Sequence, residues 1–160
     1  MRRMYSVEEL KRLIKNAPKE MSSLFDASGN PRFVEGSIKT AEKEGVTYTY
    51  AKWSLSGTHL MIVICATIES GTVWNNTYFA TIENLPDYIK SKIIPVWANE
   101  FILQQKFSAF DNSWNAQELN ITLAKQQTSP NNLYLYQPGN VTFATTKNIR
   151  IELDLLVDAQ

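Results

Sequence analysis

The strict alternation of apolar and polar residues near the end of the chain most strongly limits what this sequence can fold into. In residues 149–157 the apolar positions lie two apart: Ile149, Ile151, Leu153, Leu155 and Val157. A period of two is typical of a β-strand with one buried and one solvated face. We therefore expect Glu152 and Asp154, on the polar side, to belong to the solvated face rather than to a catalytic acid–base pair.

Short runs rich in β-branched and aromatic residues fill the chain from Val46 onward. Turn residues separate them at intervals near the ~8–12 residues typical of sandwiches and barrels. The expected strands cover 46–50, 52–56, 59–68, 73–82, 96–110, a run around 119–123, 133–137 and 149–157. One or two helical turns are expected within 85–95, which has a proline near each end. This pattern predicts an all-β fold, an antiparallel β-sandwich of jelly-roll type.

A short amphipathic helix is expected before the β region. Ser6 and Glu9 have the spacing of a capping box, and Pro18 ends the helical pattern. Its apolar stripe has the spacing of a coiled-coil seam: Val7, Leu10, Ile14 and Ala17. Because a helix of ~12 residues is marginal alone in water, it needs a partner. That partner is either this chain's own β-domain or the same helix of neighbouring subunits, as in a trimeric coiled coil.

These patterns divide the chain into three expected regions. Residues 1–21 form a helix or stalk, residues 22–45 form a connector with turns, and residues 46–160 form the β-sandwich head. No apolar stretch reaches the ~18 residues that a membrane helix needs, and the charged start is unlike a signal peptide. We therefore expect no membrane insertion, and synthesis in a cytoplasm.

The composition argues against several classes of function. Sixteen basic and sixteen acidic side chains cancel, so no strong field exists to attract nucleic acid. The six glycines never have the spacing of a phosphate-binding loop. With one histidine, His59, and one cysteine, Cys65, we expect no metal cluster and no cofactor. We expect His59 at the rim of a strand and Cys65 as a small buried thiol.

The loop at residues 111–116 is the best candidate for a binding site. It combines Trp114 with Asp111, Asn112 and Asn115. Aromatic faces stack on the C–H faces of a pyranose, while amide and carboxylate groups bind its hydroxyls. These four residues therefore form a candidate carbohydrate site, although a structural role for Trp114 is equally compatible with the pattern. Trp74, within a predicted strand, fits the core or a subunit interface better.

Two tyrosines are candidates for a subunit interface. Tyr134 and Tyr136 lie on the strand face opposite Leu133 and Leu135, so the face outside the core displays two phenol rings in a row. Aromatic faces of this kind are enriched at protein interfaces. Together with Val7, Leu10 and Ile14 they form the expected trimer interface.

Several segments together resemble the head regions of tail-fibre, receptor-binding and head-fibre structural proteins of tailed phages that infect Gram-positive bacteria. Residues 5–14 resemble their helical necks, and 52–60 the strand pair that opens their heads. Residues 85–93 resemble their interstrand helical turn, and 150–158 their closing strand. The resemblance implies a homotrimeric virion protein that binds a host cell-wall polysaccharide or decorates the virion beside other virion proteins. The departure is size, because these 160 residues carry no long shaft or anchoring shoulder.

The leading hypothesis is a non-enzymatic virion protein used in host attachment. One alternative is a capsid or tail accessory protein that binds only other virion proteins. A second alternative is a fragment of a glycan depolymerase, which would need two carboxylates facing each other across a cleft.

Overall fold

The computed structural model describes residues 6–15, 33–93, 101–125 and 132–157. The helices are α1 (Val7–Lys15) and α3 (Asp87–Lys90). The strands are β1 (Phe33–Ser37), β2 (Val46–Ser56), β3 (His59–Ile68), β4 (Val73–Ile82), β5 (Phe101–Phe110), β6 (Ala116–Lys125), β7 (Leu133–Thr142) and β8 (Lys147–Leu156). The predicted all-β fold is confirmed, since every pairing between these strands is antiparallel.

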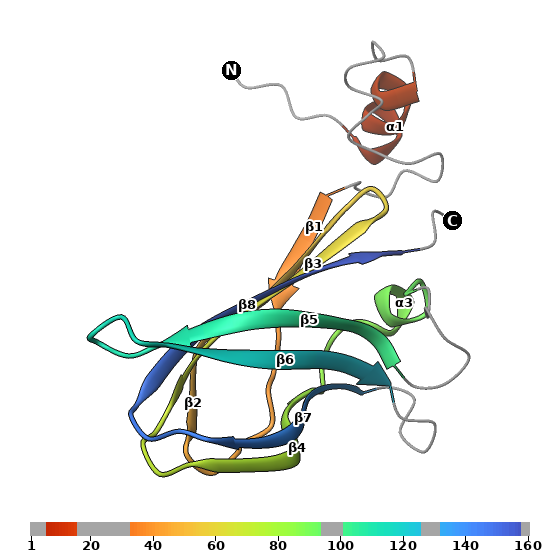
Figure 1. The fold of residues 1–160 in the computed structure, drawn as a ribbon. Helices are drawn as coiled ribbons and strands as arrows, with labels where there is room; N and C mark the ends of the chain where they lie inside the picture. Colours follow the sequence, from red (N-terminus) through yellow and green to blue (C-terminus); the bar gives the residue numbers. More distant parts are fainter. Residues whose placement is uncertain (1–5, 16–32, 94–100, 126–131, 158–160) are drawn as a thin grey trace.

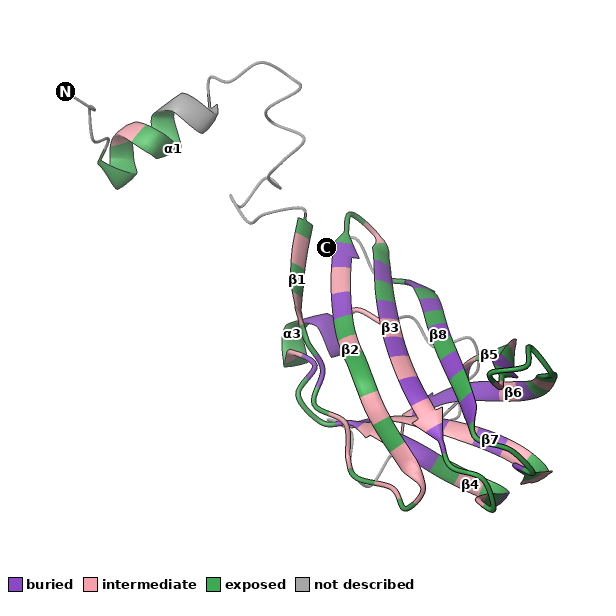
Figure 2. Ribbon diagram, turned by 90° about the vertical axis from the view of Figure 1, so that its left-hand side faces the viewer, coloured by how far each residue is buried: buried purple, intermediate pink, exposed green. Residues whose placement is uncertain are grey.

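The strands form one curled sheet in the order β1-β2-β3-β8-β5-β6-β7-β4 (Figure 1). From β3 to β8 the pairing is nested: β5 pairs with β6, β4 with β7, and β3 with β8. The chain from β3 onward therefore runs like a long hairpin folded over on itself. Figure 2 shows β1, β2, β3 and β8 side by side, with the remaining strands turning away beyond β8.

The folded-over sheet closes around a single apolar core. Beyond β1, the backbone returns to the far edge strand β4, where the N–H of Ala41 donates to the oxygen of Thr81 (3.1 Å). The Tyr48 hydroxyl on β2 also donates to the carbonyl of Phe79 on β4. The core between the two halves draws on β3, β4, β6, β7 and β8, and its fully buried members include Ile62, Trp74, Phe79, Ile121, Leu135 and Leu153.

The alternation predicted for the last strand is confirmed. Along β8 the residues from Lys147 to Leu156 are buried and exposed in strict turn. Trp74 lies in the core as expected, 1% exposed, with its ring stacked on Phe79 (centroids 4.7 Å apart). Glu152 and Asp154 are exposed, and Asp154 accepts a 3.1 Å contact from the rim residue His59. One face of the sheet is therefore apolar and the other solvated.

The structure differs from the sequence-based expectation in several places, and one of them is β7, which continues to Thr142 where a strand ending at residue 137 was expected. The runs 46–50 and 52–56 form one strand, β2, with a bulge between Tyr48 and Tyr50. Strand β1 lies within the segment expected to be a connector, and it pairs with β2 from Phe33↔Ser56 to Ser37↔Lys52. The expectation of a buried Cys65 is wrong, because this residue alternates with buried Ile64 and Ala66 and is partly exposed.

Other expectations hold only within the described residues. The helical turn expected in 85–95 is α3, and residues 94–95 lie outside the described part. The same is true of residues 96–100 before β5, and of residues 16–17 after α1. No described helix is long and apolar enough to cross a membrane.

Strand β4, at the edge of the sheet, carries two irregularities. Its pairing with β7 shifts register between Asn75 and Thr77 and again between Tyr78 and Ala80. Asn76, at the first shift, has a positive φ of 47°. Its side-chain oxygen accepts hydrogen bonds from the N–H of Gly139 (2.8 Å) and the hydroxyl of Tyr136 (3.1 Å). The bulges twist this edge strand away from a regular ladder.

Two leucines on β8 test the assignment of faces. Leu153 is fully buried, whereas Leu156 is 58% exposed. We expect Leu153→Ala to lower the free energy of unfolding by about 2–5 kcal/mol, because it leaves a cavity in the core. Leu156→Ala, the matched control, should change it by no more than about 0.5 kcal/mol. Urea unfolding measures both, and equal losses would contradict this placement of β8.

Candidate functional site

The hairpin between β5 and β6 presents Trp114 to solvent. The indole is 82% exposed, and the backbone of Trp114 has a positive φ of 64°. The backbone N–H of Trp114 donates to the carbonyl of Asp111 (3.0 Å), while the backbone N–H of Asp111 donates to the carbonyl of Asn115 (3.2 Å). This is a short turn followed by a left-handed residue, a position that usually carries glycine. A bulky residue there is strained, and strained positions cluster at functional sites.

Asp111 holds the hairpin in this conformation. Its Oδ1 accepts from the backbone N–H groups of Ser113 and Asn115, both at 2.9 Å. Its Oδ2 accepts from the Thr145 hydroxyl and from the Lys147 ammonium group, both at 3.1 Å. The amide of Asn115 also donates to both carboxylate oxygens. A carboxylate with this many donors fixes the path of the loop around it.

The ion pair between Asp111 and Lys147 is largely buried. The Lys147 side chain is 7% exposed and that of Asp111 is 10% exposed. Lys147 also donates to the carbonyl of Asn115 (2.8 Å), so one cation from the start of β8 holds both ends of the loop. The backbone N–H of Asn115, assisted by the Lys147, Asn115 and Thr145 side chains, holds the pKa of Asp111 well below its usual value. The carboxylate therefore stays ionised where a free aspartate would be protonated.

The four residues of the predicted carbohydrate site lie on one loop with two different roles. Trp114 and Asn112 are exposed, and no hydrogen bond joins the side chain of Asn112 to the described residues. Asp111 and Asn115 are bonded to each other and to Lys147. The structure thus leaves Trp114 and Asn112 available to a ligand, while Asp111 and Asn115 shape the loop.

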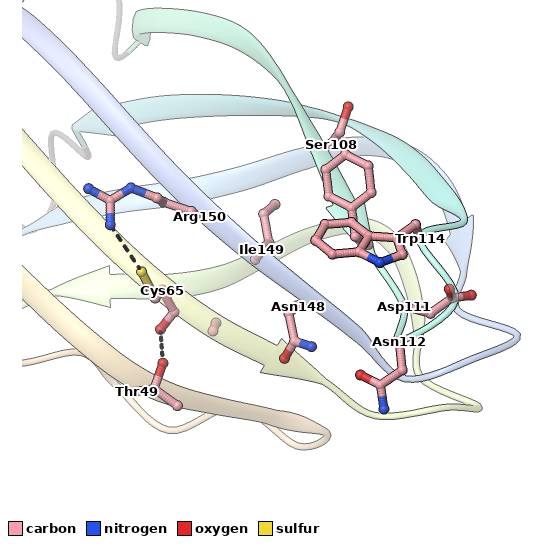
Figure 3. A pocket seen from close by; sticks show the side chains of 11 residues that line it. Thr49, Cys65, Ser108, Asp111, Asn112, Trp114, Asn148, Ile149 and Arg150 are labelled. Atoms are coloured by element: carbon pink, nitrogen blue, oxygen red, sulfur yellow. Dashed lines mark hydrogen bonds between the residues drawn. The ribbon is translucent and has the colours of Figure 1, made fainter.

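An open groove of about 680 Å³ runs from this loop across the outer face of the sheet (Figure 3). Its size falls within the range of small-molecule sites. Trp114 and Phe110 form an aromatic wall in its lining, with their rings edge to face and their centroids 6.2 Å apart. The lining comes from β2, β3, β5, β8 and the loop: Thr49, Cys65, Ala66, Ser108, Phe110, Asp111, Asn112, Trp114, Asn148, Ile149 and Arg150.

Arg150 and Cys65 lie at the other end of the groove. The Arg150 Nε and Nη2 atoms contact Glu152 Oε1 at 2.6 and 2.5 Å, while Nη1 lies 4.0 Å from Cys65 Sγ. The Glu152 carboxylate raises the pKa of Arg150. Sequence reasoning missed this end of the groove. Alternation places Arg150 on the solvated face, but nothing in the sequence shows that Cys65 lies opposite it.

The residues expected at a trimer interface occupy two separate surfaces. On α1, Val7 is 67% exposed and Leu10 is 45% exposed, and α1 lies clear of the sheet in both views (Figures 1 and 2). The side chain of Ile14 is outside the described part. The Ser6–Glu9 capping box is present, with its two hydrogen bonds at 2.9 and 3.1 Å.

Tyr134 and Tyr136 are half-buried on the outer face of β7, as predicted from their alternation with buried leucines. They lie beside a third tyrosine, Tyr78 on β4, whose place on a predicted strand also suggests the core or a subunit interface. The Tyr78 ring centroid lies 5.5 Å from that of Tyr134 and 5.0 Å from that of Tyr136. These three residues form the tyrosine cluster. The β4–β7 register, which pairs Tyr78 with Tyr136, brings Tyr78 into this cluster.

No group of three or more histidine, cysteine, aspartate or glutamate side chains that could hold a metal ion occurs among the described residues.

The structural role of the buried Asp111–Lys147 ion pair can be tested by comparison with an exposed ion pair. We expect Lys147→Met to lower the free energy of unfolding by about 1–3 kcal/mol, because it removes the charged partner inside the loop. It should also speed hydrogen exchange at the N–H groups of Ser113 and Asn115. Lys106→Met, the control, removes an exposed pair with Glu118 (3.0 Å) and should cost less than about 1 kcal/mol. Equal effects on stability and exchange would contradict the role given to Lys147.

Comparison with known protein families and with curated proteins finds no match for this sequence. Among solved structures, the chain is similar to the fibre head protein of bovine atadenovirus type 4. The two share 10% sequence identity with a TM-score of 0.40, and the match covers 74% of this chain and 97% of that chain.

Proposed function

We propose that this chain is the head module of a trimeric virion fibre, which attaches a phage to saccharides on the surface of a Gram-positive host. The observation that carries the proposal is Trp114. An 82% exposed indole stands beside a groove, on a strained backbone that a buried ion pair holds in place. The segment resemblance to phage fibre heads, set out from the sequence, supports the assignment to a virion.

The groove offers the chemistry that sugars require. Trp114 and Phe110 supply an aromatic wall for the C–H faces of a ring, and Asn112, Ser108 and Asn148 supply hydrogen-bonding groups along it. The carboxamide oxygen of Asn148 accepts from Thr67 (2.8 Å), which leaves its NH₂ group to donate. The hairpin is fixed before any ligand arrives, so little conformational entropy is lost on binding.

Three identical sites on one rigid body suit attachment to a repetitive surface. Linking weak sites raises the effective concentration for the second and third contacts, so modest affinities combine into durable adhesion. In this proposal α1 packs with its own copies through Val7, Leu10 and Ile14, and the tyrosine cluster contributes a second contact between subunits. Such a helix gains stability from its copies that it lacks alone.

Neither alternative is supported as well by the groove. A retaining or inverting glycosidase needs two carboxylates across the substrate. In the described lining Asp111 is the one carboxylate, and Lys147 and the loop already occupy both of its oxygens. An accessory protein that binds only virion proteins would give the strained Trp114 a protein partner instead of a sugar, and the following experiment separates the two.

Trp114→Ala tests the attachment role. We expect it to weaken sedimentation with a panel of purified Gram-positive cell walls at least tenfold, about 1.4 kcal/mol, while thermal stability and assembly stay unchanged. Tyr88→Ala is the matched control, since Tyr88 is 50% exposed on α3 and does not line the groove. If Trp114→Ala leaves wall binding unchanged but prevents incorporation into virions, the accessory role is favoured. Absence of wall binding by the unaltered protein would contradict attachment itself.

The oligomeric state tests the role of α1. We expect a trimer at micromolar concentration in analytical ultracentrifugation, and a monomer after the double change Val7→Glu and Leu10→Glu, because charges would replace the apolar seam. Glu8→Gln on the same helix is the control, since Glu8 lies outside the apolar stripe and contacts Lys11 at 3.4 Å. A monomeric unaltered protein would contradict the proposed fibre.

A further inference from the structure

The groove continues well beyond the loop that first identified it. Asn148 lies opposite Phe110 in the sheet, and Arg150 lies opposite Cys65. Both side chains stand on the outer face of β8, two residues apart, which separates them by about 7 Å along the strand. Trp114 and Arg150 therefore lie at opposite ends of the groove (Figure 3), and a ring that stacks on Trp114 beside Asn148 occupies the loop end only. A second ring, joined to the first, would reach Arg150.

The second position has its own set of polar groups. Glu152 orients the guanidinium of Arg150 through Nε and Nη2, while Nη1 points across to Cys65 on the neighbouring strand β3 (Figure 3). The hydroxyl of Thr49 faces the same end and donates to the carbonyl of Cys65 (3.4 Å). An oriented N–H donor beside a hydroxyl can bind a sugar hydroxyl or carbonyl oxygen.

The charges of the groove are already paired. Asp111 is bonded to Lys147, and Arg150 is bonded to Glu152, so neither charged lining residue presents an uncompensated charge to a ligand. A carboxylate or phosphate placed at Arg150 would also meet the negative charge of Glu152. The groove therefore favours uncharged ligands.

We propose that the groove binds two consecutive uncharged sugar units, one stacked on Trp114 and the next hydrogen-bonded to Arg150 Nη1. This inference rests on the proposed attachment function, and it specifies the ligand class of the same site. Trp114 then supplies most of the affinity through stacking, while Arg150 distinguishes a disaccharide from a single ring. Binding should depend little on salt, because no net charge is neutralised.

The experiment begins with a glycan array of neutral and acidic oligosaccharides of one to six units. Free mono-, di- and trisaccharides of the best glycan are then titrated by NMR at about 50 and about 500 mM NaCl. The Debye length is roughly 14 Å at the lower concentration, where screening is weak, and roughly 4 Å at the higher one, where screening is strong. We expect a neutral glycan to bind, with a rise in affinity of at least tenfold from one unit to two. The rise from two units to three should be much smaller.

Arg150→Gln provides the decisive variant. It should reduce disaccharide affinity to about that of the monosaccharide and leave monosaccharide binding unchanged. Lys52→Gln is the matched control, because it removes one cation on β2, 5.5 Å over the ring of Tyr50, without changing the groove lining. Both side chains are exposed, so both variants are expected to fold.

The outcomes separate this inference from the proposed function. Affinity that does not depend on chain length, a preference for acidic glycans, or equal effects of Arg150→Gln and Lys52→Gln would each overturn the two-unit site while leaving attachment through Trp114 intact. Failure of the unaltered protein to bind every glycan and every cell wall would instead overturn the proposed function.

Discussion

The burial of one face of a single folded sheet is the constraint on which the rest of the structure depends. Because β3, β7 and β8 turn alternate residues inward, the residues between them are forced onto the outside. The tyrosine cluster consists of outward residues of this kind, and so do Thr49, Cys65, Asn148 and Arg150 in the groove. The surface chemistry of the molecule is thus a consequence of how its core is packed.

Much of the fold could be predicted because periodicity is local. The alternation at Ile151 and Leu153 identified β8 and its faces, and the position of Trp74 within a strand suggested its burial. Strand β1 was missed because its five residues are held by pairing with β2 rather than by a pattern of their own. Local sequence shows which face a residue occupies but not which strand lies beside it.

The candidate site was predicted only in part for the same reason. Trp114 and Asn112 could be found because an aromatic residue in a polar loop is a local signal. Lys147, which lies 36 residues from Asp111 along the chain, gave no such signal, and it turns Asp111 from a possible ligand contact into a structural element. Arg150 and Cys65 are 85 residues apart, and only the β3–β8 register brings them together.

The irregular edge strand β4 has a consequence for how copies of this protein can associate. A straight, fully exposed edge would allow one sheet to extend into the next without limit, as in fibrillar aggregates. The two register shifts beside Asn76 and Phe79 interrupt the row of N–H and C=O groups that such growth requires. Extension of the sheet by backbone pairing is therefore disfavoured at the β4 edge, and a contact made there would depend on side chains.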